Sequence, residues 1–123
     1  MRVFKNSWFQ RFARKERISE ASLCEAVARA GVGLIDTDLG GGLIKQRIAR
    51  VGAGKSGGYR TLVFFRAEAR AIFAFGFAKS DRDNIDAADQ ADLKKAARTL
   101  LALSEAGIDR LVAAGTLEEV DCG

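Results

Sequence analysis

Three strand-like segments follow one another in the middle of the chain, and the short connections between them leave few ways to fold. The segments cover residues 43–51, 59–66 and 71–77 and are rich in β-branched and aromatic side chains. A glycine-rich stretch, GAGKSGG, joins the first to the second, and a polar turn, RAEAR, joins the second to the third. Because parallel neighbours need a much longer crossover, these connections predict an antiparallel sheet.

Helix signals precede this sheet along the chain. After a weakly alternating segment at residues 1–5, which predicts a short strand, Asn6 or Ser7 can cap a first helix. Ser19 is a good N-cap for a second helix, and we assign its left-handed C-terminal residue to Gly31. Each predicted helix has one apolar side, made by Trp8, Phe9 and Phe12 in the first and by Leu23, Ala26, Val27 and Ala30 in the second.

The remaining segments complete the prediction. Residues 34–42 form a loop or short strand that ends in a glycine triplet. A helix is predicted from about residue 86 to residue 105, ended by Gly107, and residues 108–120 predict a short helix plus tail. The long helix has an apolar stripe of Leu93, Ala96, Ala97, Leu100 and Leu101. Alternation in the third strand predicts one aromatic face of Phe73, Phe75 and Phe77.

This order of elements predicts a single α+β domain over residues 1–123. An N-terminal helical hairpin would pack on a small antiparallel β-sheet, followed by a C-terminal helix. We expect the helices to cover one face of the sheet and to leave the other partly open.

Positive charge is concentrated on the predicted sheet. Residues 43–79 contain eight Lys or Arg against the single acid Glu68, whereas residues 86–123 contain four against eight acids. Ile44 and Ile48 suit the covered face of the first strand, so alternation places Lys45 and Arg47 on the open face. A basic face of this kind favours a polyanion, such as a nucleic acid, as the partner.

Composition excludes several other classes. The chain has no His and only two Cys, Cys24 and Cys122, from which we expect neither a disulfide nor a metal site. No run approaches the about 18 apolar residues that span a bilayer, and the N-terminal sequence lacks the apolar region of a signal peptide. We therefore expect a cytoplasmic protein with no metal, no cofactor and no membrane partner.

Part of the glycine-rich connection is similar to a nucleotide-binding P-loop. Residues 49–56, ARVGAGKS, end in Gly-Lys-Ser but have Ala49 where the first glycine belongs. A strand-like segment follows where a P-loop requires a helix. We therefore do not expect hydrolysis of ATP or GTP, although the loop can still bind a phosphate through its amides and Lys55.

The cations of the sheet could support RNA cleavage without His or metal. Such cleavage needs a base for the 2′-hydroxyl, stabilisation of the charged phosphorane and an acid for the leaving oxygen. Arginine provides permanent bidentate charge for the phosphorane, and a lysine among other cations can serve as base or acid. Tyr59, the only tyrosine, can stack on a base or take part in proton transfer. The same residues are equally sufficient for binding alone.

The sequence also resembles a known family. The run KQRIARVGAGKSGGYRTLVFF, followed by GFAKSDRDNI and a Leu/Ala-rich helix, is similar to toxins of bacterial type II toxin–antitoxin modules of the RelE/ParE superfamily. The similarity is closest to a HigB-like and RelE-like branch that shares K-x-R-I-A-R, G-K-S-G-G-Y-R and G-F-A-K-S. The resemblance implies a RelE-like fold and a toxin that cleaves mRNA, commonly on the ribosome. It also implies inhibition by a cognate helix-turn-helix antitoxin.

The resemblance suggests roles for individual residues. Tyr59 and Arg60 match a Gly-Tyr-Arg shared with RelE-type ribonucleases, whose Arg contacts the scissile phosphate. Lys45 and Arg47 correspond to basic residues of the preceding strand, and Lys79 to one after the third strand. These five are the candidate catalytic residues, and the candidate nucleic-acid-binding residues are Arg50, Lys55 and Arg82.

Two departures from the pattern keep other functions open. Ser80 stands where RelE-type ribonucleases have an Arg, and Asn84, Ile85 and Asp86 stand where they carry a catalytic Tyr. ParE-like members of the superfamily inhibit DNA gyrase and are not nucleases. The alternatives to a ribonuclease are therefore a non-enzymatic toxin against gyrase or another protein, and a degenerate toxin retained for antitoxin binding.

Overall fold

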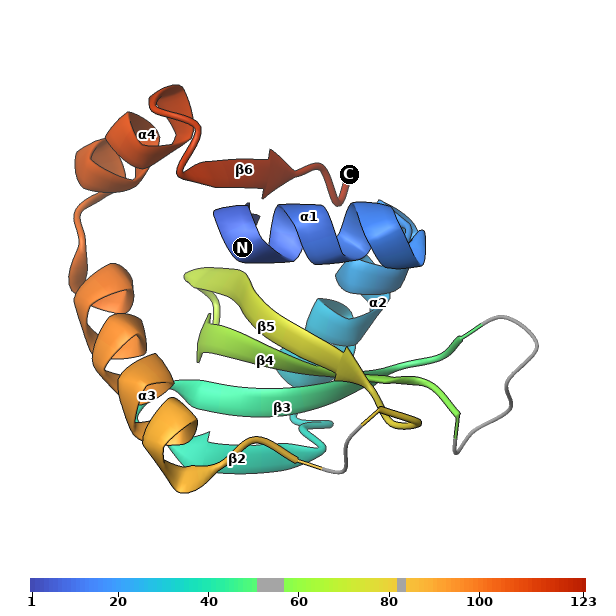
Figure 1. Ribbon diagram of the computed structural model, residues 1–123. Coiled ribbons are helices and arrows are strands. Elements are labelled where there is room, and N and C mark those ends of the chain that lie inside the picture. Colours follow the sequence, from blue (N-terminus) through green and yellow to red (C-terminus); the bar gives the residue numbers. More distant parts are fainter. Residues whose placement is uncertain (51–56, 82–83) are drawn as a thin grey trace.

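A central sheet is the framework of the molecule. Its strands are β1 (Arg2–Asn6), β2 (Thr37–Gly40), β3 (Leu43–Ile48), β4 (Tyr59–Arg66), β5 (Arg70–Ala78) and β6 (Leu117–Val120). The computed structural model describes residues 1–50, 57–81 and 84–123, and within these ranges the strands form one six-stranded sheet in the order β2-β3-β4-β5-β1-β6 (Figure 1). β1 runs parallel to β5, and the other neighbouring strands are antiparallel, as predicted for β3, β4 and β5.

Helices α1 (Ser7–Glu16) and α2 (Glu20–Gly31) cover one face of this sheet. Both predicted caps are confirmed: the side chain of Asn6 accepts a hydrogen bond from the Phe9 N–H at 2.8 Å, and that of Ser19 accepts one from the Ser22 N–H at 3.1 Å. The apolar sides predicted for the two helices pack into one core cluster with the sheet. The left-handed residue after α2 is Gly33, with φ +88°, and not Gly31, which still belongs to the helix.

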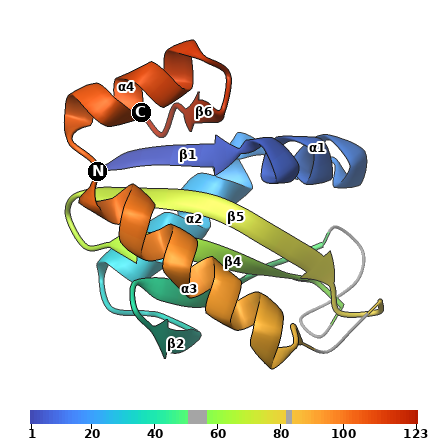
Figure 2. The same ribbon diagram turned by 60° about the vertical axis from the view of Figure 1, so that its left-hand side comes forward.

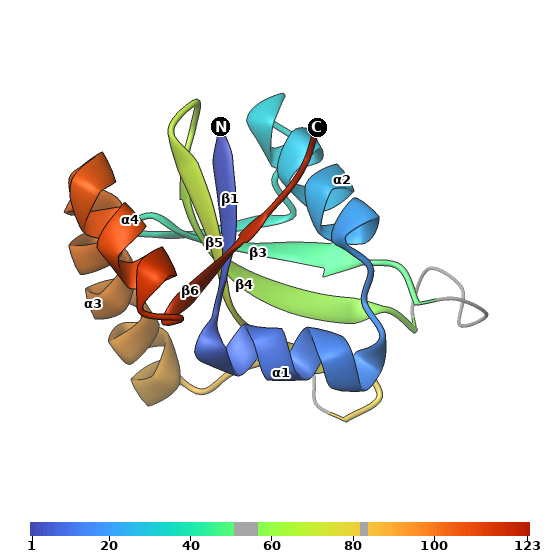
Figure 3. The ribbon, with the colours of Figure 1, turned by 90° about the horizontal axis from the view of Figure 1, so that it is seen from above.

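Helices α3 (Ala87–Ala102) and α4 (Glu105–Ala113) cover the opposite face. In Figure 3 they lie to the left of the strands, whereas α2 lies to the right; Figure 2 shows α3 crossing in front of the sheet. The predicted Leu/Ala stripe of α3 packs into the second core cluster with Phe64 and Phe77. The prediction that helices cover only one face is therefore wrong, because this stripe needs an apolar surface to bury it, and α3 and α4 cover part of the second face.

The C-terminal third differs from the prediction in where its helices begin and end. The long helix ends at Ala102, because Leu103 takes an extended conformation and Ser104 starts a new helix by accepting a hydrogen bond from the Gly107 N–H at 3.0 Å. Gly107 thus lies in the first turn of α4 and ends no helix. The predicted tail contains β6, which pairs with β1 along the edge of the sheet.

A register shift in β5 divides the aromatic residues between the two faces. Leu62 of β4 lies opposite Phe75, but Val63 lies opposite Phe73, so Ala74 is an extra residue. Such a bulge reverses the alternation of side chains beyond it. Phe73 consequently packs with α1 and α2, whereas Phe75 and Phe77 pack with the cluster of α3 and α4. The single aromatic face predicted for this strand is therefore wrong.

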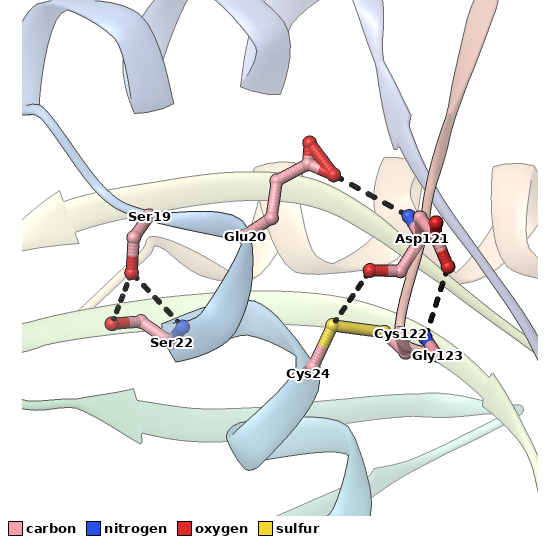
Figure 4. Close-up of a disulfide and its surroundings, with 7 residues drawn as sticks. All are labelled: Ser19, Glu20, Ser22, Cys24, Asp121, Cys122 and Gly123. Atoms are coloured by element: carbon pink, nitrogen blue, oxygen red, sulfur yellow. Dashed lines mark hydrogen bonds between the residues drawn. A yellow bond between two sulfur atoms is a disulfide. The ribbon is translucent and has the colours of Figure 1, made fainter.

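A disulfide fixes the end of the chain to α2. Cys24 and Cys122 are bonded, with their Cα atoms 5.5 Å apart (Figure 4). The expectation that the cysteines form no disulfide is wrong, because β6 carries Cys122 back to α2 although 98 residues separate the pair in sequence. Beside the bond, the Asp121 N–H donates to the carboxylate of Glu20 at 3.3 Å.

Arg2 is the centre of an ion-pair cluster that holds α4 and β6 to β1. Its guanidinium lies 2.8 Å from Glu105, 2.9 Å from Asp109 and 2.8 Å from Glu119. Hydrogen bonds from Arg2 keep the pKa of the Glu105 and Glu119 carboxyls below the ordinary value. The cluster therefore stabilises the C-terminal segment above about pH 4.5, and this stabilisation is lost as these carboxylates become protonated at lower pH.

Candidate functional site

Strand β3 presents its cations on the face that alternation predicted. Ile44 and Ile48 are buried against α1 and α2, so Lys45 and Arg47 project from the other face, the one that α3 partly covers. Lys45 is half-buried, and its Nζ lies 3.4 Å from the side-chain oxygen of Asn84. Arg47 is exposed at the end of the strand.

Arg60 of β4 lies directly opposite Arg47 in the sheet. Like charges at facing positions of two strands destabilise a sheet unless an anion or a carboxylate compensates them. The Nη1 atom of Arg60 is buried and has no hydrogen-bond partner among the described residues. An unpaired buried guanidinium nitrogen is unfavourable in the free protein.

A cavity of about 240 Å³ lies beside this pair at the end of β3. Its wall includes three arginines, Arg29, Arg47 and Arg60, and one acid, Glu25; Ile48 and Ala49 complete it. Glu25 is itself paired with Arg29, its carboxylate lying 2.9 Å from Nε. The cavity is therefore positive, and a phosphate group is the ligand that its arginine donors suit.

Arg29 is a member of this site that the sequence did not indicate. It lies on α2, four residues after Glu25, and such spacing predicts only an exposed ion pair on one helix. The site also contains Asp36, whose carboxylate lies 3.6 Å from the Arg47 guanidinium. Both residues reach Arg47 through tertiary contacts that no local pattern encodes.

Tyr59 lies on the other face of the sheet. Its ring is only 4% exposed, and its hydroxyl donates to the carboxylate of Glu16 at 3.0 Å. Burial, and then the negative charge of Glu16, raise the pKa of the Tyr59 hydroxyl above its ordinary value. The structure thus separates Tyr59 from Arg60, its neighbour in sequence, by the thickness of the sheet.

Arg50 also belongs to the side of Tyr59, since its guanidinium lies 5.6 Å from the centre of that ring. Both residues line a cavity of about 610 Å³ between the end of α1 and the start of α2. Lys79 is exposed in the turn after β5, where its N–H donates to the carbonyl of Gly58 at 3.1 Å. The predicted binding residues Lys55 and Arg82 lie outside the described residues.

The structure thus gathers Lys45, Arg47 and Arg60 on one face and places Tyr59 and Arg50 on the other. In the described part of the chain, no group of three or more Cys, Asp or Glu side chains is arranged to hold a metal ion. The helices described there are also too short or too polar to cross a membrane.

Comparison with known proteins gives the family. No curated protein matches this sequence. The model of the family described as "RelE toxin of RelE / RelB toxin-antitoxin system" matches residues 1–120, which is nearly the whole chain. That family pairs its toxins with antitoxins of the RelB type. With the helices, the mostly antiparallel sheet and this match in agreement, the chain belongs to the RelE toxin family of type II toxin–antitoxin systems.

Proposed function

We propose that this toxin is a metal-independent endoribonuclease that cleaves mRNA. The observation that carries the proposal is the facing pair of Arg47 and Arg60, both of which line a cavity together with a third arginine, Arg29. Cleavage through the 2′-hydroxyl passes through a phosphorane that carries more negative charge than the bound phosphate. Two fixed guanidinium groups stabilise that charge more strongly than the charge of the ground state.

Lys45 is our candidate for proton transfer or for positioning the phosphate. It lies two residues before Arg47 and therefore on the same face of β3. Lys79, exposed in the turn after β5, would contact the RNA backbone from the neighbouring strand. We leave Tyr59 out of the cleavage site, because its hydroxyl is bonded to Glu16 on the opposite face. Roles in RNA binding remain proposals for Arg50, Lys55 and Arg82.

We further infer that the toxin is neutralised by a cognate antitoxin. The family implies a partner of the RelB type, while the sequence motifs point to an antitoxin of the helix-turn-helix class. An acidic segment of that partner would complement the basic face around Arg47 and Arg60. Cuts confined to translated frames would identify mRNA on the translating ribosome as the substrate.

The test is expression in bacteria without an antitoxin, with growth followed and mRNA ends mapped by sequencing. Wild type should arrest growth and produce new mRNA ends within translated frames. Arg60→Ala should lower cleavage on the order of 100-fold to 1,000-fold, since removal of one donor to a transition-state oxyanion has an effect of that size.

The matched control is Arg66→Ala, which removes the same charge from the other end of β4, where the side chain bonds to the carbonyl of Leu101. This variant should cleave like wild type. Arrest with intact mRNA would contradict the proposal and favour a toxin that inhibits gyrase or another protein. Absence of arrest would indicate a degenerate toxin retained for its complex with the antitoxin.

A further inference from the structure

We propose that Arg29 and Asp36 are positioning residues that hold Arg47 beside Arg60 so that both guanidinium groups can bind one phosphate. The expected effect on RNA cleavage rests on the proposed function. The contacts that hold Arg47 can be tested without it.

Asp36 holds Arg47 at two points. One carboxylate oxygen accepts a hydrogen bond from the Arg47 backbone N–H at 2.7 Å. The other lies 3.6 Å from Nη2 of the Arg47 side chain. The Asp36 side chain is only 21% exposed, so its charge is less screened by water than that of a fully solvated carboxylate. Backbone and side chain of Arg47 are thus fixed by a single residue.

Arg29 holds the other backbone group of Arg47. Its Nη2 donates a hydrogen bond to the Arg47 carbonyl, and its Nη1 lies 3.5 Å from the Asp36 carboxylate. The ladder between β2 and β3 begins only at Thr37 and Lys45, so no strand residue pairs with Arg47 on that side. Side chains of Arg29 and Asp36 therefore take the place of a neighbouring strand.

This arrangement decides how Arg47 meets Arg60. In an antiparallel pair, the N–H and C=O of one residue point to the same side of the strand. Because both groups of Arg47 are used toward Arg29 and Asp36, its pairing with Arg60 is of the non-hydrogen-bonded kind. Side chains lie closest together in such pairs. Arg29 and Asp36, which we call the brace, therefore fix the strand pairing that places the side chains of Arg47 and Arg60 close together where they leave the backbone.

The brace is itself anchored in the core. Gln46, which is 1% exposed, accepts a hydrogen bond from the Asp36 N–H at 2.7 Å. Its amide nitrogen donates to the carbonyls of Ala26 at 3.0 Å and Leu34 at 3.3 Å. Asp36 is therefore held by the end of α2 and by β3, and the position of its carboxylate does not depend on a loop alone.

The charges of the group explain why it favours an anion. Asp36 compensates part of the positive charge of Arg29 and Arg47, but Arg60 has no carboxylate within ion-pair distance among the described residues. A phosphate in the cavity that Arg29, Arg47 and Arg60 line would supply the missing negative charge. Removal of the Asp36 charge should let Arg47 turn away from Arg60 into solvent.

The experiment compares Asp36→Asn and Arg29→Lys with wild type and with Asp38→Asn. Asp38 is the matched control, because it is an exposed carboxylate of β2 that accepts a hydrogen bond from the nearby Gly40 N–H at 2.9 Å. We expect Asp36→Asn to lower kcat for cleavage of a short RNA by about 10-fold to 100-fold, the size of effect that misplacement of a catalytic group produces. KM should change less, Asp36→Glu should restore part of kcat, and Asp38→Asn should behave as wild type.

A second measurement does not depend on activity. In protein labelled with ¹⁵N-arginine, the Nε–H signal of Arg47 should be sharp in wild type and averaged by motion in Asp36→Asn. An unchanged Arg47 signal together with an unchanged kcat would overturn the positioning role. If wild type leaves RNA intact, the proposed function fails, and the Arg47 signal alone then decides whether the brace exists.

Discussion

At the scale of single residues, Tyr59 offers a direct probe of the core beneath α1. Its hydroxyl donates to Glu16, and burial together with that carboxylate raises the pKa of the hydroxyl above its ordinary value. The folded protein therefore keeps this proton at a pH where the unfolded chain, with a tyrosine pKa of about 10, has lost it. Because the folded state then binds more protons, the free energy of unfolding should fall as pH rises above about 10.

The slope from this one group cannot exceed about 1.4 kcal/mol per pH unit, the limit for one proton. Tyr59→Phe removes that contribution and, at neutral pH, should cost about 1 kcal/mol through the lost hydrogen bond. Urea unfolding of both proteins at several pH values measures the difference. Since Tyr59 is the only tyrosine, tyrosinate absorbance of the folded protein reports its titration alone. Parallel curves for the two proteins above pH 10 would contradict the expectation.

The sequence pattern also predicted the placement of some single side chains correctly. The apolar positions Ile44 and Ile48 determine the face of Lys45 and Arg47, so alternation alone predicted their placement. Alternation equally implies that the neighbours Tyr59 and Arg60 point to opposite faces. Grouping them in one site followed from the family resemblance and not from the strand pattern. Arg29 was not predictable, because its role depends on where α2 ends relative to β3.

At the scale of elements, local signals predicted most helix starts and strands. Caps such as Asn6 and Ser19 act through the chain next to them, and their positions were correct. The break at Leu103 was not predicted, because the Leu- and Ala-rich composition continues through it. The extra residue at Ala74 and the four-residue β6 depend on partner strands, which a local pattern does not contain.

The turn between β2 and β3 makes an element-scale prediction. Gly42 has φ +85°, and a Cβ added there would lie 2.6 Å from Cδ1 of Leu101 on α3. Gly42→Ala should therefore combine backbone strain with a forced shift of the Leu101 side chain and lower the free energy of unfolding by about 2–4 kcal/mol. Chemical denaturation measures this loss.

Gly41→Ala is the control for backbone strain without the collision. Gly41 has φ +64°, but its added Cβ would meet only Lys94, at an ordinary distance of 3.7 Å. This variant should lose about 1–2 kcal/mol. Equal losses in the two variants would show that α3 does not pack tightly against this turn.

At the scale of the whole molecule, the sequence pattern did not predict that helices pack on both faces of the sheet. The Leu/Ala stripe of α3 predicts a buried side but does not say which surface buries it. The disulfide was equally hidden, because two cysteines 98 residues apart give no spacing signal. The family resemblance did fix the α+β class and the order of the elements.

The disulfide should make a large contribution to stability. It closes most of the chain into one loop, and a crosslink over a loop of this length contributes roughly 2–5 kcal/mol. Addition of a reductant should therefore lower Tm by on the order of 10 °C. Scanning calorimetry with and without reductant measures the shift. Cys24→Ser should show the lower Tm and no response to reductant, whereas a wild type that ignores reductant would contradict the prediction.

The pairing of the last strand with the first has a consequence for synthesis. β1 can pair with β5 as soon as residue 78 has been made, but its other edge stays unpaired until residues 117–120 follow. The disulfide of Cys24 likewise forms only after Cys122 has been made. A growing chain can therefore assemble the facing pair of Arg47 and Arg60 while the outer edge of β1 still presents open backbone groups to other chains. Synthesis of residues 117–122, and not formation of the basic face, closes the molecule.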